Sequence, residues 1–178
     1  MAGPAAPNRG ARIKRASIAA SILGLIALAG YSGAVLATSA SGFSGSTLAK
    51  ATFGEIDSHV IAEPTWQEFI KTHGDSDLYV QQNIWQPGGS TGWHTHPGPS
   101  FVIVTLGSVT VYDGEDPSCS PHVYTANTAN NSFIDPGDGH VHIIRNETAS
   151  LAQTIAVQLI PSGAVRRQDA SNPGNCPF

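Results

Sequence analysis

The chain has 178 residues, which is enough for one domain of ordinary size and too few for two. Only 12% of the residues are charged and the formal net charge is −4, which excludes a coiled coil and a basic nucleic-acid-binding protein. With 19 glycines, 12 prolines and only 2 cysteines, the composition favours a loop-rich β domain and excludes paired clusters of zinc-binding cysteines.

The first 40 residues have the pattern of an export signal. Basic residues between positions 9 and 15 precede residues 16–37, which carry no charge and contain an apolar run from Ile18 to Leu28. A basic start, an apolar centre and small residues after it are typical of a secretory signal peptide, here with cleavage after Ala37 or Ala40. Residues 16–37 are also long enough to span a bilayer, so an uncleaved anchor helix is the alternative. In both cases we expect a secreted or cell-envelope protein.

The part after residue 40 is acidic, because all 13 acidic residues lie there. An acidic surface argues against nucleic acid and anionic lipid as partners. We therefore expect contact with a membrane only through an uncleaved N-terminal segment. Residues 41–60 begin with a run of serine and glycine, which predicts a linker or N-terminal extension before the folded domain.

Residues 61–165 are predicted to fold as one all-β domain. Short β-branched or alternating runs bounded by Gly and Pro turns predict strands over 78–84, 101–106, 108–112, 122–125, 132–134, 140–146 and 151–160. The two runs on either side of Gly107 are typical of a hairpin, and residues 135–139 predict a turn. Around Thr65 a short helical turn competes with a strand starting at Phe69.

The two cysteines lie in segments without regular secondary structure. Cys119 is in a turn-like stretch and Cys176 is close to the carboxyl end, in a tail predicted over 166–178. In an oxidising compartment such a pair predicts a disulfide, and two free thiols are the alternative. We expect the tail to be held in place only if the bridge forms.

Four of the seven histidines form two close pairs, His94 with His96 and His140 with His142. Residues two apart on a strand point the same way, so each pair can direct two imidazoles to one point. Neutral imidazole is a common ligand of transition metals near neutral pH. Two such pairs, each beside a Gly/Pro turn, predict a metal site.

The spacing around these pairs resembles the two motifs of the cupin superfamily. The first motif, G-x5-H-x-H-x3,4-E-x6-G, is similar to the series Gly88, His94, His96, Ser100 and Gly107. The second, P-x-G-x2-H-x3-N, is similar to Gly139, His142 and Asn146, with Pro136 one position further upstream than the pattern has it. The resemblance covers roughly residues 78–160.

The resemblance implies a double-stranded β-helix, or jelly-roll barrel, with a metal bound inside it. Carried over by position, the implied metal ligands are His94, His96 and His142. The glutamate of the first motif falls on Ser100, and a hydroxyl is a poor ligand beside a carboxylate. This departure predicts a three-histidine site with its other positions open. His140 is the candidate catalytic residue, as a proton shuttle, and a fourth ligand or a pocket wall are its alternatives.

The implied cofactor is a divalent transition metal, and ligand type alone leaves Fe, Mn, Cu, Ni and Zn open. One hypothesis for the function is a dioxygenase-like or other metal-dependent enzyme acting on a small molecule. A second is a non-catalytic module that binds a small anionic or sugar-like ligand. A third is a metal-free jelly roll that self-associates, and a homodimer stays open in each case. The fold alone does not decide among them.

Overall fold

The computed structural model describes residues 1–3, 37–63 and 65–178. The chain divides into two units, 1–33 and 34–178, and the fold below is that of the second. Nearly all of the predicted signal or anchor segment, with all but the last residue of the predicted helix over 16–37, lies outside the described residues. Within the described ranges, no helix has the length and apolar character needed to cross a membrane.

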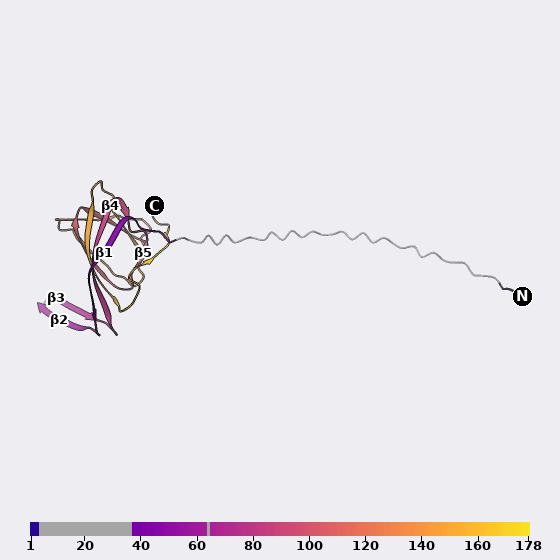
Figure 1. The fold of residues 1–178 in the computed structure, drawn as a ribbon, viewed down its shortest axis with the longest axis horizontal. Helices are drawn as coiled ribbons and strands as arrows, with labels where there is room; N and C mark the ends of the chain where they lie inside the picture. The colour runs from indigo at the N-terminus through magenta and orange to yellow at the C-terminus, as the bar shows by residue number, and fades with distance from the viewer. Residues whose placement is uncertain (4–36, 64) are drawn as a thin grey trace. The chain divides into compact units, whose positions relative to one another are not determined.

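The folded unit is built from β-strands, which confirms the all-β prediction for the residues described here (Figure 1). The strands in chain order are β1 (Ser41–Phe53), β2 (Asp57–Glu63), β3 (Trp66–Lys71), β4 (Ser76–Ser90), β5 (His94–Thr95), β6 (Ser100–Leu106), β7 (Ser108–Asp113), β8 (His122–Thr125), β9 (Ser132–Asp135), β10 (His142–Arg145), β11 (Ala152–Pro161) and β12 (Gln168–Asp169). Strands β2 and β3 form a separate two-stranded hairpin, and the other ten belong to one antiparallel sheet.

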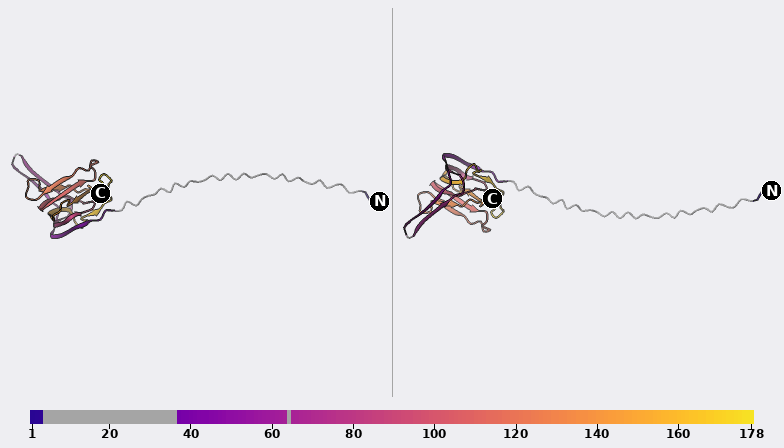
Figure 2. Two further views of the ribbon diagram at one scale, coloured as in Figure 1. Left: turned by 90° about the horizontal axis from the view of Figure 1, so that it is seen from above. Right: turned by 90° about the horizontal axis from the view of Figure 1, so that it is seen from below.

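The ten-stranded sheet consists of two five-stranded layers. One layer has the order β1–β4–β11–β6–β9, and the other has the order β8–β7–β10–β5–β12. The layers join where β10 pairs with β4 at Arg145 and Ser90. The sheet thereby curves into an antiparallel barrel, which is consistent with the expected jelly roll (Figures 1 and 2).

The main core lies between the two layers. Trp85 of β4 and Val104 of β6 face Val109 of β7 and Ile144 of β10, and all four are buried. Phe43 of β1 packs against Trp85 with ring centroids 4.9 Å apart. Because each layer buries alternate residues of its strands, the same alternation also directs polar side chains from both layers into the interior.

Strands β6 and β7 exist where they were predicted, but the predicted hairpin at Gly107 is wrong. Strand β6 pairs with β11 and β9, whereas β7 pairs with β10 and β8, so the chain crosses from one layer to the other at Gly107. Gly107 has a φ of 66°, and a Cβ there would lie 2.5 Å from the carbonyl oxygen of Leu151. A glycine that allows a tight layer crossing gives the same local pattern as a glycine in a hairpin.

Two further segments differ from the sequence-based expectation. The predicted linker that begins at residue 41 instead forms β1, whose backbone pairs with β4 along the whole strand. Most of its side chains are small and exposed, so the sequence has no alternation of apolar and polar residues that would predict this strand. Around Thr65, strand β3 starts at Trp66, so the strand alternative is correct and the helical turn is wrong.

The predicted disulfide between Cys119 and Cys176 is present, and it joins two cysteines that are 57 residues apart in the sequence. Cys176 packs with Trp93, Tyr112 and Ile143 in a second buried cluster. The tail thus covers one layer of the barrel. A disulfide of this kind indicates an oxidising environment outside the cytoplasm.

Candidate metal centre

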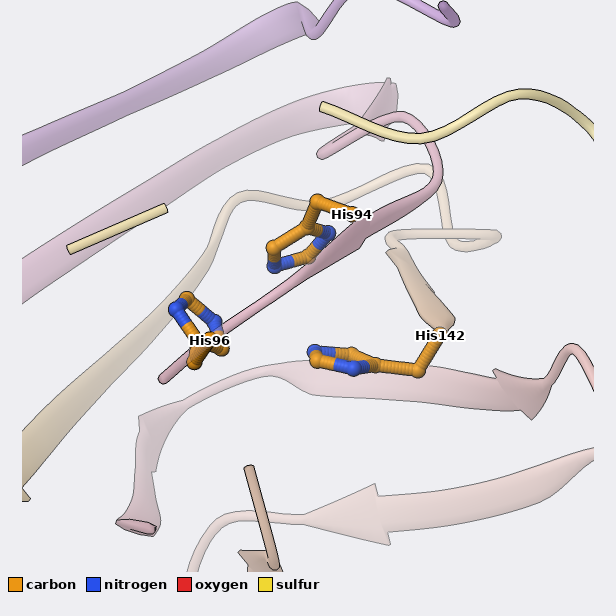
Figure 3. A group of neighbouring side chains, drawn as sticks. All are labelled: His94, His96 and His142. Atoms are coloured by element: carbon orange, nitrogen blue, oxygen red, sulfur yellow. The ribbon is translucent and has the colours of Figure 1, made fainter. Parts of the chain in front are cut away.

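The structure brings the three predicted ligands together inside the barrel. His94 of β5 and His142 of β10 are direct partners in the antiparallel pairing, so their side chains leave the same face. His96 follows β5 directly, two residues beyond His94. The ring centroids lie 4.3 to 5.5 Å apart, and one nitrogen from each ring lies within 4.8 Å of the others (Figure 3).

Each of the three rings uses its Nδ1 atom for a backbone carbonyl. The Nδ1 of His94 lies 2.9 Å from the carbonyl oxygen of Gly92, and that of His96 lies 2.6 Å from the oxygen of Arg166. The Nδ1 of His142 lies 3.3 Å from the carbonyl oxygen of His140. Because a carbonyl can only accept, each Nδ1 carries the proton, and the lone pair of each neutral ring is on Nε2.

Burial keeps these rings neutral. Desolvation lowers the pKa of His94 well below 6.5 and lowers that of His96, and it lowers the pKa of His142 to about 4. The positive charge of neighbouring groups, Arg167 among them, acts in the same direction on His94. At neutral pH the three side chains therefore present lone pairs rather than protons, which is the state that binds a metal.

This donor set fits a divalent transition metal. Three neutral imidazoles whose second nitrogen donates to a backbone carbonyl have the orientation that metal-binding histidines adopt. The three nitrogens come from neighbouring positions on one layer of the barrel, so the space facing the other layer stays available for further ligands. His94, His96 and His142 could thus hold a metal ion.

Ser100 lies in the same interior, as the motif spacing implies. It is buried on β6, and its hydroxyl accepts a hydrogen bond from Nε2 of Gln158 at 3.2 Å. Its cross-strand partner is Asp135, the last residue of β9. Asp135 is 5% exposed and lines the same cavity. The sequence pattern predicted only a turn that begins at Asp135.

Two glycines bring Asp135 close to the histidines. A Cβ on Gly98 would lie 2.2 Å from the carbonyl oxygen of Leu159, and a Cβ on Gly137 would lie 2.4 Å from the backbone of Gly98. The loops that follow His96 and Asp135 can therefore approach backbone to backbone. As a result, Oδ2 of Asp135 lies 3.6 Å from Nε2 of His96.

His140 occupies a different place from the other three histidines. Its ring stacks on that of His142 with centroids 5.9 Å apart, which agrees with the expectation that the two share a face. Its Nε2 lies 3.1 Å from Asp113, and its Nδ1 lies 4.0 Å from Asp135. Among the described residues, those lining the cavity do not include His140. The ring thus lies behind His142 rather than beside it.

The cavity in front of the histidines has a volume of about 170 Å³. One wall is apolar, with Phe43, Trp85 and Phe133, and another carries the side chains of Arg166 and Arg167. Arg166 donates to Gln158 at 3.1 Å, and its guanidinium lies over the ring of Tyr79. Both arginines belong to the C-terminal tail, and no motif pointed to them. The volume suits a molecule of only a few heavy atoms.

Together, the fold and the site define an antiparallel β-barrel protein with a buried three-histidine centre. No protein-family model and no curated protein matches the sequence. Solved structures similar to it include peruvianin-I, a cysteine peptidase from Thevetia peruviana latex, at 25% identity and a TM-score of 0.42, covering 53% of this chain and 56% of that one. An oxalate oxidase is 18% identical with a TM-score of 0.39, covering 48% of this chain and 46% of that one.

A cupin superfamily protein from Desulfitobacterium hafniense is also similar, at 10% identity and a TM-score of 0.38, covering 64% of this chain and 79% of that one. The chain thus spans about half the length of the first two proteins. Within the chain itself, both histidine motifs converge inside one antiparallel barrel, as the cupin resemblance implied. The barrel and the histidine cluster are those that the cupin resemblance implies.

Proposed function

We propose that this chain is an exported cupin that holds a divalent transition metal through His94, His96 and His142 and acts as a metal-dependent enzyme on a small molecule. The observation that carries the proposal is the convergence of three buried, neutral imidazoles on one cavity. Burying three such rings with their lone pairs unused would cost desolvation free energy, and binding of a cation offsets that cost.

An ion bound there would supply Lewis-acid or redox chemistry at a site with positions left for a substrate and for O₂ or water. The protein's own groups would bind and orient the substrate. The apolar side chains of Trp85 and Phe133 exclude water from the cavity, while Arg166 and Arg167 add positive charge to its lining. We therefore propose a small anionic substrate.

His140 is proposed to pass protons between the site and the outside. Its ring lies between Asp113, which is 37% exposed, and Asp135 in the interior. An imidazole between two carboxylates can accept a proton on one nitrogen and release one from the other.

The second candidate function is capture of a small anion without turnover. The same two arginines favour it, because they provide charge complementarity whether or not a reaction follows. Arg167 is fixed by Asp169 at 2.7 Å and by the carbonyl oxygen of Thr91, so its charge is held in place before a ligand arrives. Preorganisation of this kind serves a binding protein and an enzyme equally.

Elemental analysis of protein purified from its native compartment tests the metal site. We expect about one equivalent of Fe, Mn, Cu, Ni or Zn per chain, and we expect His142→Ala to lose it. His122→Ala is the matched control, because His122 lies on the exposed part of β8 and should leave the metal content unchanged. Native protein that holds no transition metal would refute the proposal.

Oxygen uptake by the metal-loaded protein then separates the enzyme from the binding module. We would assay a panel of small diols, thiols and carboxylates, with His142→Ala as the control for uptake by free metal. Uptake that needs both the metal and one class of compound supports the enzyme. Saturable binding of the same compounds, measured by calorimetry without any turnover, supports the binding module instead.

A further inference from the structure

Asp135 has a buried carboxylate oxygen that nothing in the described structure satisfies. Its Oδ1 accepts a hydrogen bond from the backbone nitrogen of Gly137 at 3.1 Å. Its Oδ2 is buried and has no hydrogen-bond partner among the described residues. An unpaired carboxylate oxygen in the interior is costly, so its retention calls for a partner of positive charge.

The atom that faces Oδ2 of Asp135 indicates where a positively charged partner would bind. Oδ2 lies 3.6 Å from Nε2 of His96, which is too long for a hydrogen bond but suits two atoms that share one metal ion. The Nε2 atom is also the one that carries the lone pair of His96, because its Nδ1 donates to the backbone. Oδ2 of Asp135 therefore lies 3.6 Å from the ring nitrogen of His96 that carries the lone pair.

The position of Asp135 also bears on the glutamate that the first cupin motif has where this chain has Ser100. The two residues are cross-strand partners on β6 and β9, so their side chains leave the same face of the barrel wall. A carboxylate that is missing from one strand is therefore present on its neighbour, at the same level of the interior.

We propose that Oδ2 of Asp135 is the fourth protein ligand of the metal, in place of the carboxylate absent at position 100. The inference rests on the proposed three-histidine site and extends it to a centre of three nitrogens and one oxygen. One carboxylate among neutral imidazoles lowers the charge of a divalent ion's complex to +1. An oxygen donor also raises the relative affinity for Mn²⁺, which prefers carboxylates more than Cu²⁺ does.

The variant Asp135→Asn isolates this oxygen. The amide retains an Oδ1 acceptor for Gly137, and it replaces only Oδ2, by an NH₂ group that cannot bind a metal. Asp138→Asn is the matched control, since Asp138 lies on the same loop and is exposed. Thermal unfolding of the metal-free proteins, followed by circular dichroism, establishes that both variants fold.

Binding of Mn²⁺ and of Zn²⁺ is then measured by the electron paramagnetic resonance of free Mn²⁺ and by chelator competition for Zn²⁺. We expect Asp135→Asn to weaken Mn²⁺ binding by at least about tenfold, the loss typical even of groups that only orient a ligand. Asp138→Asn should bind as the wild type does. Equal Mn²⁺ affinity in Asp135→Asn and wild type would overturn the inference while leaving the three-histidine site intact.

A crystal structure of the Mn²⁺-loaded wild type decides the matter if the variant does not fold. A distance of about 2.0–2.2 Å from the ion to Oδ2 of Asp135 supports the inference. An ion bound by the histidines and water, with Asp135 turned away, overturns it. If the wild type binds neither Mn²⁺ nor Zn²⁺, the proposed function itself fails, which is a distinct result from failure of the fourth ligand.

Discussion

His94 and His142 are 48 residues apart in the chain and face one another directly across the pairing of β5 with β10. Their ring centroids are 4.3 Å apart, and both side chains are almost fully buried. Two imidazoles so close together and so deeply buried oppose each other's protonation. This relationship links the metal site to the pH dependence of folding.

The stability of the metal-free protein should fall in mild acid because of His142. Burial lowers its folded-state pKa to about 4, whereas the unfolded chain has the ordinary value of 6.5. As the pH falls below 6.5, the unfolded chain takes up a proton that the folded chain refuses until about pH 4, so protonation favours unfolding. Above pH 6.5 the titration of His142 does not change the free energy of unfolding. By pH 4 it has lowered that free energy by about 3 kcal/mol.

Urea unfolding of metal-free wild type and of His142→Gln, at pH 7 and pH 4.5, checks this prediction. Other groups titrate in both proteins, so the difference between their pH dependences isolates His142. We expect the variant to lose less stability in acid than the wild type does. Equal losses in the two proteins would contradict the assignment of a buried, neutral His142.

Removal of the disulfide should destabilise the domain and free its tail. Cys119 and Cys176 close a loop with a sequence separation of 57. In the chain-entropy model a bridge of this span contributes about 4 kcal/mol to the free energy of unfolding. The double variant Cys119→Ser/Cys176→Ser should lose stability of that order in urea unfolding. Dithiothreitol should lower the midpoint of the wild type and leave that of the double variant unchanged.

Asn146, the last residue of the second motif, should contribute to stability rather than to the metal site. Its side-chain amide donates to the carbonyl oxygens of Gln86 and Ser150, and its Oδ1 accepts from Thr148. Loss of these buried hydrogen bonds in Asn146→Ala should cost about 2–3 kcal/mol of the free energy of unfolding. Metal affinity should stay within twofold of wild type in the variants that fold.

Asn130→Ala is the comparison for that experiment, because Asn130 is exposed and makes its side-chain hydrogen bond to Val123 at the surface. It should cost less than about 1 kcal/mol. If the two substitutions destabilise equally, the buried position of Asn146 does not matter as argued.

The mature protein should begin at Thr38 if the proposed signal peptide is cleaved. The hydroxyl of Thr38 accepts a hydrogen bond from the backbone nitrogen of Trp93 at 2.5 Å, and its own backbone nitrogen donates to Ala170. Cleavage after Ala40 would remove these contacts from the folded unit, whereas cleavage after Ala37 keeps them. Amino-terminal sequencing of the exported protein distinguishes the two, and a mature protein starting at Ser41 would contradict this expectation.

Local sequence patterns predicted several of the central strands and pointed to the three histidines. Strands β6, β7 and β11 follow from alternation and β-branched residues, which depend on neighbours a few positions away. Strand alternation predicted that His94 and His96 share one face, and it was the resemblance to the cupin motifs that implied His142 as their partner. The cysteine pairing followed from there being only two cysteines in an oxidising context.

Only the tertiary structure decided which strands pair and which other side chains reach the site. The crossing at Gly107, the pairing of β1 with β4, and the approach of Asp135 to His96 depend on contacts between segments far apart in the chain. The residues next to Gly107, β1 and Asp135 in the sequence do not indicate any of these roles. The conformations of Gly107, β1 and Asp135 are fixed by backbone pairing and by packing between segments far apart in the chain, and that free energy exists only once the barrel has formed.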